Sequence, residues 1–311
     1  MKRSGSLNYF ELKKAVLDKE KCIRCGACII ACPIDSLVLD PYPKLVDKCL
    51  ECGKCAKACP IVKKDGDGFD RKKAFAAKTK SLDILKNSQD GGVVTSILFQ
   101  LFEKDKIDKA IVVGGENDLE PKAKIVSSKN ELNKTAGTKY GLTPVISKLQ
   151  DIKGSEDVAV VGTPCQSKAA RMLKEMGFGI EYIIGVFCMQ NFNSVELKNK
   201  FEKKGIKNEE IKDLTITNGK FQVNTKDDKK KLPISEFDSC VPRACSSCVD
   251  FEAKHADISI GSVGSEKDHS TVIIRTKKGK EMFELTKDKL EYIELNSLQQ
   301  VDKLGTIKLK K

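Results

Sequence analysis

The chain has 311 residues, enough for one small and one medium-sized domain, each with its own core. Hydrophobic residues make up 40% of it and charged residues 32%, a balance that argues against a disordered protein. The net charge of +12 suits anionic partners, but with 6% aromatic residues and no zinc-finger or recognition-helix pattern we expect no nucleic acid among them.

The lysine excess itself has two explanations, a selected anion-binding face or an ordinary solvated surface, and the sequence leaves both open. The longest apolar runs, such as residues 182–187, are far too short to span a bilayer. Residues 1–20 lack the apolar segment of a signal peptide. We therefore expect no direct membrane insertion, and any peripheral association with a membrane complex would come through a partner.

An internal repeat occupies residues 22–60, where the pattern C-x2-C-x2-C-x3-C-P occurs twice. The glycine after the second cysteine also recurs, as Gly26 and Gly53. A disulfide framework does not repeat thiols this closely, because neighbouring cysteines could not all find separate partners. The repeat contributes eight cysteines: Cys22, Cys25, Cys28 and Cys32 in the first copy, and Cys49, Cys52, Cys55 and Cys59 in the second.

This spacing is that of the bacterial ferredoxin cluster-binding run. Three thiolates from a tight loop hold one 4Fe-4S cluster, and the fourth, one helical turn later, reaches the other cluster. The sequence therefore predicts two crossed ligand sets, Cys22, Cys25, Cys28 and Cys59 for cluster one, and Cys49, Cys52, Cys55 and Cys32 for cluster two. Zinc is the alternative, but four-ligand zinc sites have no reason to be doubled and crossed. Iron-ligating thiolates need a reducing compartment, so we expect a cytoplasmic protein.

Residues 63–73 are charged, contain two glycines and lack an apolar period, which is typical of a linker. We predict a ferredoxin-like domain over residues 1–66 and a second domain over residues 73–311. In the second domain the pattern predicts a helix over residues 90–104 capped by Asp90, a helix that follows residues 163–166 and runs to about residue 176, and helices over 194–204 and 279–290. Strands are predicted at 110–113, 157–162, 182–187, 257–260 and 271–275, and a hairpin at 214–225 around Asn218-Gly219.

Strands that alternate with helices predict a parallel crossover arrangement. The expected fold class is α+β, with a small bacterial-ferredoxin-like domain followed by an α/β domain whose sheet is partly parallel.

Four of the remaining cysteines stand where a further ligand site would need them. Cys165 and Cys188 each follow a predicted strand, so both thiols should lie at the carboxyl edge of the sheet, where open α/β sheets bind ligands. Cys245 and Cys248 form a CxxC pair in a loop, and the four together would suffice for a third 4Fe-4S cluster. Buried structural thiols are the alternative. Cys240 is a spare that could replace one ligand.

Two helix starts offer bare backbone amides, at Gly91-Gly92 and at Thr163-Pro164, which would suit phosphate groups. A glycine before a helix is more often only a turn. The chain has neither the G-x-G-x-x-G dinucleotide fingerprint after a strand nor a G-x-x-x-x-G-K-[ST] phosphate loop. The two histidines, His255 and His269, are given no role.

A series of ordered motifs carries a family resemblance: QDGGVVTSIL at 89–98, IDKAIVV at 107–113, GTKY at 137–140, GTPCQ at 162–166, GVFC at 185–188, CSSCVDF at 245–251, ADISIGSVG at 256–264 and STVIIRT at 270–276. From residue 74 to about residue 290 the chain resembles the beta-subunit family of coenzyme F420 hydrogenases and dehydrogenases. With its ferredoxin domain, it is similar to the input subunits of reduced-F420 dehydrogenases from methanogenic archaea. It is also similar to the N-terminal half of F420-dependent sulfite reductases, without their reductase half.

The resemblance implies one FAD and one further 4Fe-4S cluster in the body, with hydride exchange between coenzyme F420 and the FAD. A deazaflavin transfers two electrons at once and a cluster one, so a flavin must stand between them. The implied path is coenzyme F420, FAD, body cluster, ferredoxin clusters and a partner redox subunit or complex, with no acid–base catalytic residue required. The partner and the direction of flow stay open.

The resemblance also carries FAD contacts onto matching positions, namely Gly91, Gly92, Thr95, Thr138, Lys139, Tyr140, Thr163 and Gln166. Lys139 and Arg243 are candidates to bind the anionic tail of coenzyme F420. Where relatives often have an aromatic residue before the Ser-Thr-Val stretch, this chain has Asp268-His269, which puts a ring contact there in doubt. Two other functions stay open: the same scaffold acting on another reductase substrate, and an electron-carrier subunit without flavin.

Overall fold

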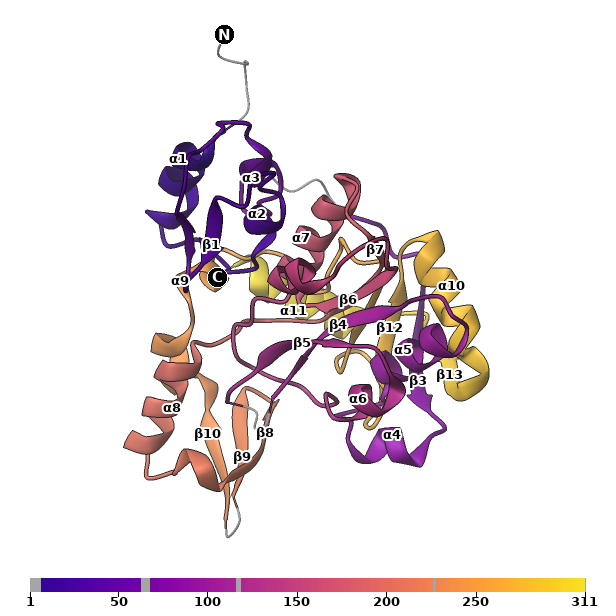
Figure 1. The fold of residues 1–311 in the computed structure, drawn as a ribbon. Helices are drawn as coiled ribbons and strands as arrows, with labels where there is room; N and C mark the ends of the chain where they lie inside the picture. The colour runs from indigo at the N-terminus through magenta and orange to yellow at the C-terminus, as the bar shows by residue number, and fades with distance from the viewer. Residues whose placement is uncertain (1–6, 63–67, 116–118, 226–227, 311) are drawn as a thin grey trace.

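The computed structural model describes residues 7–62, 68–115, 119–225 and 228–310. A small N-terminal unit packs on a larger body whose centre is a mixed sheet, with a second small sheet to one side (Figure 1). The mixed α/β body, its partly parallel sheet and the ferredoxin-like unit confirm the predicted fold class. Residues 63–67 of the predicted linker lie outside the described residues, and residues 68–72 have no regular secondary structure.

The N-terminal unit repeats one local structure twice. The helices α2 (Ala27–Ile30) and α3 (Lys54–Lys57) each start directly after a glycine with a left-handed backbone, Gly26 at φ +91° and Gly53 at φ +72°. Only glycine adopts these angles at low cost, which explains the repeated glycine of the motif. Between the two helices, β1 (Leu37–Leu39) and β2 (Pro43–Leu45) form an antiparallel hairpin.

An N-terminal helix that the sequence analysis did not predict packs against this unit. It consists of α1 (Tyr9–Leu12) and a following π-helical turn, Lys13–Leu17. Asn8 and Glu11 form a reciprocal capping box at its start, a signal that is present in the sequence. Tyr9, Leu12 and Val16 are buried beside the cysteine-bearing helices.

The main sheet has the strand order β13-β3-β12-β11-β7-β6-β4-β5. Its central strands are parallel, as predicted: β4 (Lys109–Gly114), β6 (Val158–Gly162), β7 (Ile180–Val186) and β11 (Ile258–Gly261). The outer pairings are antiparallel and involve β5 (Lys122–Val126), β12 (Ser270–Ile274), β3 (Lys73–Thr79) and β13 (Leu290–Glu294). Of the outer strands only β12 was predicted.

Alternate residues of the buried strands feed two separate cores, because successive side chains point to opposite faces of a sheet. Ala110 and Val112 pack on the face covered by α5 (Val93–Glu103) and α10 (Lys277–Thr286). Ile111 packs on the other face, together with α7 (Pro164–Glu175) and residues of the N-terminal unit. The ferredoxin-like unit is therefore part of one of the two cores. In Figure 1 its helix α2 lies beside α7.

The second sheet contains β8 (Ile211–Thr217), β9 (Lys220–Thr225) and β10 (Lys229–Pro233). The predicted hairpin between β8 and β9 is confirmed, and both Asn218 and Gly219 have the positive φ that such a two-residue turn requires. Helix α8 (Ser194–Lys203) and a 3-10 turn, Ile234–Cys240, cover this sheet. Its core contains four phenylalanines: Phe192, Phe201, Phe221 and Phe237.

Two predicted element boundaries were wrong. Helix α5 starts at Val93 after Gly92, whose φ of +67° turns the chain into the helix, so Asp90 does not cap it. Asp90 instead accepts a hydrogen bond from the Ser262 hydroxyl. The predicted helix over residues 279–290 ends earlier, since α10 gives way to a 3-10 turn, Lys287–Lys289, and then to β13.

Four further helices complete the described fold: α4 (Leu82–Lys86), α6 (Lys129–Asn133), α9 (Arg243–Ser246) and α11 (Gln299–Leu309). Short 3-10 turns occur at Ile146–Asp151 and Asn208–Glu210. No helix in the described part of the chain has the length and apolar character needed to cross a bilayer.

Candidate electron-transfer site

The thiols predicted for cluster two surround a single cavity in the N-terminal unit. Cys32 from the first copy of the motif lines it together with the second-copy residues Cys49, Cys52 and Cys55. Burial raises the pKa of the Cys55 thiol to about 11, and Cys49, Cys52 and Cys32 contribute to the rise, so the four thiols lie within electrostatic range of one another. Cys52 is exposed, which puts this group next to the protein surface.

The thiols predicted for cluster one form a second, more deeply buried group. Burial raises the pKa of Cys22 to about 11, with a contribution from the nearby Cys59. The pKa of the buried Cys28 is raised by burial first, and then by Cys59 and Cys22. Cys25, also buried, has the same neighbours. Thiols with raised pKa values stay protonated at neutral pH, so binding of iron would displace their protons.

The two groups share a local geometry that follows from the repeated sequence. The backbone N–H of Arg24 donates to Cys22 Sγ at 3.4 Å, and the N–H of Glu51 donates to Cys49 Sγ at 3.4 Å. Arg24 and Glu51 both have positive φ, +52° and +50°, a strained conformation for residues with a side chain. In each copy this backbone conformation directs an N–H group toward the cysteine sulfur. Hydrogen bonds of this kind support the ligands of a metal cluster.

A cavity of about 320 Å³ in the body brings together all four cysteines predicted for a third cluster, Cys165, Cys188, Cys245 and Cys248. Cys165 lies in the first turn of α7 and Cys188 follows β7, so both come from the carboxyl ends of adjacent parallel strands. The CxxC pair comes from α9 and the turn after it.

Burial dominates the ionisation of these thiols. It raises the pKa of Cys188 to about 12 although Lys308 opposes it, and it raises the pKa of Cys165 still further, with Cys248 adding to the rise. The hydroxyl of Thr163 lies 3.4 Å from Cys165 Sγ, a contact that lowers the Cys165 pKa only in part. Within the residues that the structure describes, no three Cys, His, Asp or Glu side chains come close enough to hold a single metal ion, and the thiols line the walls of cavities instead.

The body cavity also reaches the N-terminal unit. Ile23, Pro60 and Ile61 line it from that side, and Ile23 and Pro60 are the sequence neighbours of Cys22 and Cys59. Residues next in sequence to two of the thiols predicted for cluster one therefore form part of the wall of the cavity that holds the body thiols.

A close backbone contact fixes the N-terminal unit at this position. The backbone N–H of Ser147 donates to Cys25 O at 3.0 Å. A Cβ added to Gly26 would lie 2.5 Å from Ser147 Cβ, so the turn Ile146–Asp151 can approach only because residue 26 is glycine. The buried face of the unit also includes Ala27, Ala31 and Ala58, whose small side chains allow close packing against α7.

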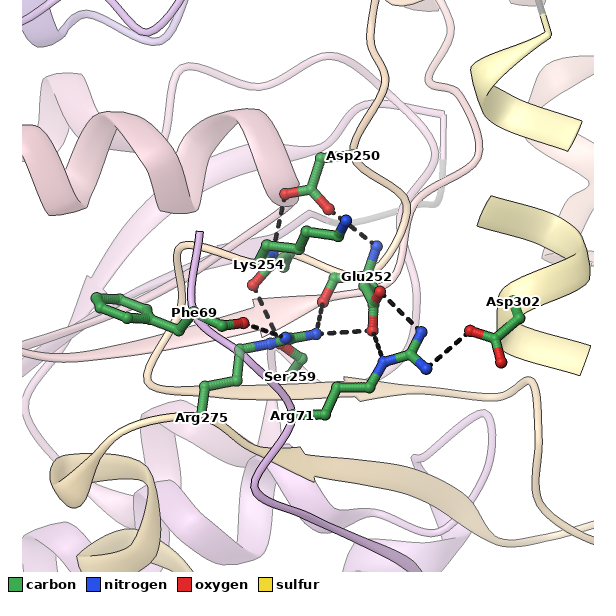
Figure 2. Close-up of polar contacts among 9 residues, drawn as sticks. Phe69, Arg71, Asp250, Glu252, Lys254, Ser259, Arg275 and Asp302 are labelled. Atoms are coloured by element: carbon green, nitrogen blue, oxygen red, sulfur yellow. Dashed lines mark hydrogen bonds and ion pairs between the residues drawn. The ribbon is translucent and has the colours of Figure 1, made fainter. Parts of the chain in front are cut away.

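The segment after Cys248 is held by an ion network that is buried at Glu252 and Arg275 and reaches the surface at Asp302 (Figure 2). Glu252 accepts hydrogen bonds from Arg275 Nη2 at 2.8 Å and from Arg71 Nε at 2.7 Å. Arg71 also pairs with Asp302 of α11 at 2.7 Å. Asp250 accepts bonds from the backbone N–H groups of Glu252 and Lys254 at 3.1 and 2.9 Å. The loop that carries the CxxC pair is thus anchored to both the sheet and α11.

Cys240 does not line the body cavity. It is 2% exposed in the phenylalanine core of the small sheet, among the residues of the 3-10 turn Ile234–Cys240. The structure therefore places this cysteine as a packing residue and gives no support to its replacing a cluster ligand.

Several predicted FAD contacts have a clear role in the fold. A Cβ on Gly91 would lie 2.3 Å from Ala77 O, and Gly92 needs its positive φ, so close packing explains the first glycine and backbone conformation the second. The Tyr140 ring packs edge-on against Phe221, and its hydroxyl accepts a hydrogen bond from the Ile216 N–H at 3.0 Å. Tyr140 therefore belongs to the small-sheet core.

Two other predicted contacts are buried in helices of the body. Thr95 is buried in the first turn of α5, and Gln166 is buried in α7, where its Nε2 donates to Thr143 O at 2.9 Å. Gln166 Oε1 has no hydrogen-bond partner among the described residues, and the same holds for Gln89 Oε1, just before Asp90. Buried amide oxygens without a partner are costly, and a bound molecule with N–H donors would relieve that cost.

The remaining candidates lie in loops and at an exposed helix start. A Cβ on Gly137 would lie 3.5 Å from Lys139 Nζ and 3.6 Å from Asn87 O, so the 137–139 loop, with Thr138 and Lys139, lies against the loop before α5. Thr163 lines the body cavity beside Cys165. Arg243 is exposed and pairs with Glu20 of the N-terminal unit at 3.0 Å.

Sequence reasoning missed several side chains of the body cavity: Lys21, Lys168, Asp250, His255 and Lys308. Burial lowers the pKa of Lys308, but Cys188 and Cys248 raise it by more, and the net pKa is raised. No signal in the sequence distinguishes this lysine from the many solvated ones.

Three family descriptions match successive parts of the chain. Residues 14–60 match the 4Fe-4S dicluster domain. Residues 74–150 match the N-terminal part, and residues 155–300 the C-terminal part, of the coenzyme F420 hydrogenase/dehydrogenase beta subunit.

Relatives agree with these matches. The chain is 37% identical to the coenzyme F420-dependent sulfite reductase of Methanocaldococcus jannaschii, over 95% of this chain and 50% of that protein, so it spans half of that relative's length. It is 33% identical to one subunit of the F(420)H(2) dehydrogenase of Methanosarcina mazei, over 95% of this chain and 91% of that protein. Among solved structures, a chain of the F420-reducing [NiFe] hydrogenase complex from Methanosarcina barkeri aligns with a TM-score of 0.74 and 29% identity, covering 80% of this chain and 92% of that one.

Proposed function

Because this chain belongs to the coenzyme F420 hydrogenase/dehydrogenase beta-subunit family, with an added 4Fe-4S dicluster domain, we propose that it exchanges hydride between coenzyme F420 and a bound FAD. Single electrons then pass through three 4Fe-4S clusters to a partner redox protein or complex. The family membership supports F420-linked electron transfer in general, and the flavin, the third cluster and the hydride step are the parts that we propose.

The observation that carries the proposal is the four-thiol cavity in the body. Its thiols from Cys165, Cys188, Cys245 and Cys248 would make up the complete ligand set of a cubane cluster, and the same cavity is walled by Ile23 and Pro60 beside cluster one. A cluster held there would lie between the sheet edge and the ferredoxin-like unit. That position supports a relay from a substrate site on the body to the N-terminal clusters.

FAD supplies the exchange between a two-electron hydride carrier and one-electron clusters when it is bound. The chain's own contribution is to bind and orient the rings and to exclude water. The unpartnered oxygens of Gln89 and Gln166 would accept hydrogen bonds from ring N–H groups, and Thr95 lies buried in the first turn of α5. Lys139 remains our candidate to bind the anionic tail of coenzyme F420, while Arg243 is already paired with Glu20.

The electron exit that we propose is cluster two. Cys52 is exposed, whereas the cluster-one thiols Cys25 and Cys28 are buried, so the Cys52 side of the N-terminal unit offers a partner the shortest approach. Relatives are named as part of a dehydrogenase, as part of a hydrogenase complex and as a sulfite reductase, and any partner of that redox class would fit.

The test is an anaerobic reaction of the FAD-loaded, iron-reconstituted full chain with reduced coenzyme F420 and a viologen dye. We expect dye reduction at a rate proportional to protein. No dye reduction by protein with full iron and flavin would overturn the F420 activity. If the protein holds full iron but cannot be loaded with flavin, the electron-carrier alternative is favoured. If another reductant reduces the dye through the protein and reduced coenzyme F420 does not, a different substrate is favoured.

A further inference from the structure

Helix α11 (Gln299–Leu309) buries a lysine on its inner face. Its two buried residues are Val301 and Lys308, seven positions apart and therefore on the same side of the helix. Lys308 is 3% exposed, while Lys303 on the same helix is exposed. At a position where a helix normally presents an apolar side chain to the core, this one presents an ammonium group.

The ammonium group reaches the wall of the body cavity. Lys308 Nζ donates to the backbone carbonyl of Cys188 and lies within electrostatic range of the Cys248 thiol. Lys308 lines the cavity together with all four of its cysteines. Asp250, a carboxylate in the same lining, lies within electrostatic range of Lys308. Among the described residues it forms no ion pair with Lys308, and its two oxygens accept hydrogen bonds from the backbone N–H groups of Glu252 and Lys254.

A carbonyl dipole, together with a carboxylate that forms no ion pair with it, balances the buried Lys308 cation only in part. Burying an ammonium without a counter-charge is costly, and buried charges in proteins are paired or coordinate a metal group. A 4Fe-4S cluster with four thiolates carries a net negative charge, which grows by one when the cluster takes up an electron. Such a cluster would supply a counter-charge directly at the Lys308 ammonium group.

We propose that Lys308 is a fixed cation for the body cluster, which stabilises the reduced form of that cluster and raises its reduction potential. The inference rests on the proposed function, because it assumes a cluster on Cys165, Cys188, Cys245 and Cys248. Only an electron moves in this step, and the lysine keeps its proton throughout. Lys308 contacts the backbone of one proposed ligand, Cys188, and gives up no electron, so its role is to place a positive charge beside the cluster.

The test is an EPR-monitored redox titration of the anaerobically reconstituted full chain, with iron content measured in parallel. In the wild type we expect three one-electron components. In Lys308→Met one component should become harder to reduce by on the order of tenfold, or ~59 mV, while the other two stay in place. Lys303→Met, which removes an exposed lysine from the same helix, should leave all three unchanged.

Each outcome decides the matter. Full iron in Lys308→Met with no shifted component overturns the proposal and leaves the proposed function standing. If Lys308→Met loses iron, Lys308→Arg decides: recovery of both iron and potential supports a charge role, and failure to recover them assigns Lys308 to packing and overturns the proposal. A wild type without a third component contradicts the body cluster itself, and the proposal falls with it.

Discussion

The buried guanidinium of Arg275 donates to Glu252 Oε2 at 2.8 Å, and this pair anchors the loop that follows the CxxC thiols (Figure 2). The Arg275 side chain is 1% exposed and also donates to Ser259 Oγ at 2.7 Å and to Phe69 O at 2.8 Å. The Glu252 carboxylate, which also binds Arg71, therefore neutralises the buried Arg275 charge. The same pair joins the end of strand β12 to the loop after Cys248.

Replacing Glu252 by Gln should destabilise the protein by about 3–5 kcal/mol, because it leaves the buried Arg275 without its counter-charge. The measurement is the guanidinium chloride midpoint under anaerobic conditions. The matched control is Glu294→Gln, which breaks an exposed pair with Lys73 and should cost about 0–1 kcal/mol. Equal losses in the two variants would show that the Arg275 site is not buried as the structure has it.

The same carboxylate should contribute to the loss of stability in acid. Burial raises the pKa of Glu252, but its bonds to Arg71 and the charge of Arg275 lower it by more, so the net pKa lies below its ordinary 4.5. A lowered folded-state pKa stabilises the fold above the unfolded-state value, and this contribution is lost as the pH falls through the folded-state pKa. The stability difference between the wild type and Glu252→Gln should therefore narrow below about pH 4.5. A difference that stays constant from about pH 7 to about pH 3 would contradict it.

The sequence could predict the parts of this site that depend on local spacing. The two cysteine runs define their own loops, and Cys165 and Cys188 follow strands whose parallel pairing brings their ends to one edge. It could not predict Lys308, because a lysine in a helix with few apolar residues has no local mark of burial, and only the packing of α11 against the cavity decides it. The prediction that Asp90 caps α5 was wrong because the helix starts after the left-handed backbone of Gly92, an angle that the sequence does not show.

Replacing Gly26 by Ala should weaken the attachment of the ferredoxin-like unit. Gly26 has φ +91°, which costs an alanine about 1–2 kcal/mol, and its new Cβ would meet Ser147 Cβ at 2.5 Å, adding about 1–3 kcal/mol. Gly177→Ala is the control, because Gly177 has the same φ of +91° with nothing within 4 Å. Thermal unfolding of both variants separates the two costs, because Gly177→Ala has the backbone cost alone and Gly26→Ala has both the backbone cost and the cost of the contact with Ser147. If they lose the same stability, the contact between residue 26 and the turn Ile146–Asp151 is not formed in solution.

Replacing Cys188 by Ala should remove the body cluster and leave the two ferredoxin clusters in place. We expect iron content to fall by roughly a third, since one of three four-iron groups is lost, while the EPR signals of the other two persist. Cys240→Ala is the matched control, because Cys240 is buried in the phenylalanine core of the small sheet and does not line the cavity. It should keep full iron and lose only the packing of one small side chain, about 1 kcal/mol or less.

The pair of variants also tests the ligand assignment against its alternatives. Full iron in Cys188→Ala together with lost iron in Cys240→Ala would mean that Cys240 ligates the cluster and that the small sheet packs differently from the structure. Full iron in both variants would contradict the body cluster. Cys165 and Cys188 would then be buried structural thiols. Zinc in place of iron in the wild type would contradict the cluster assignment at all three sites, because the same thiols would then serve a metal that carries no electrons.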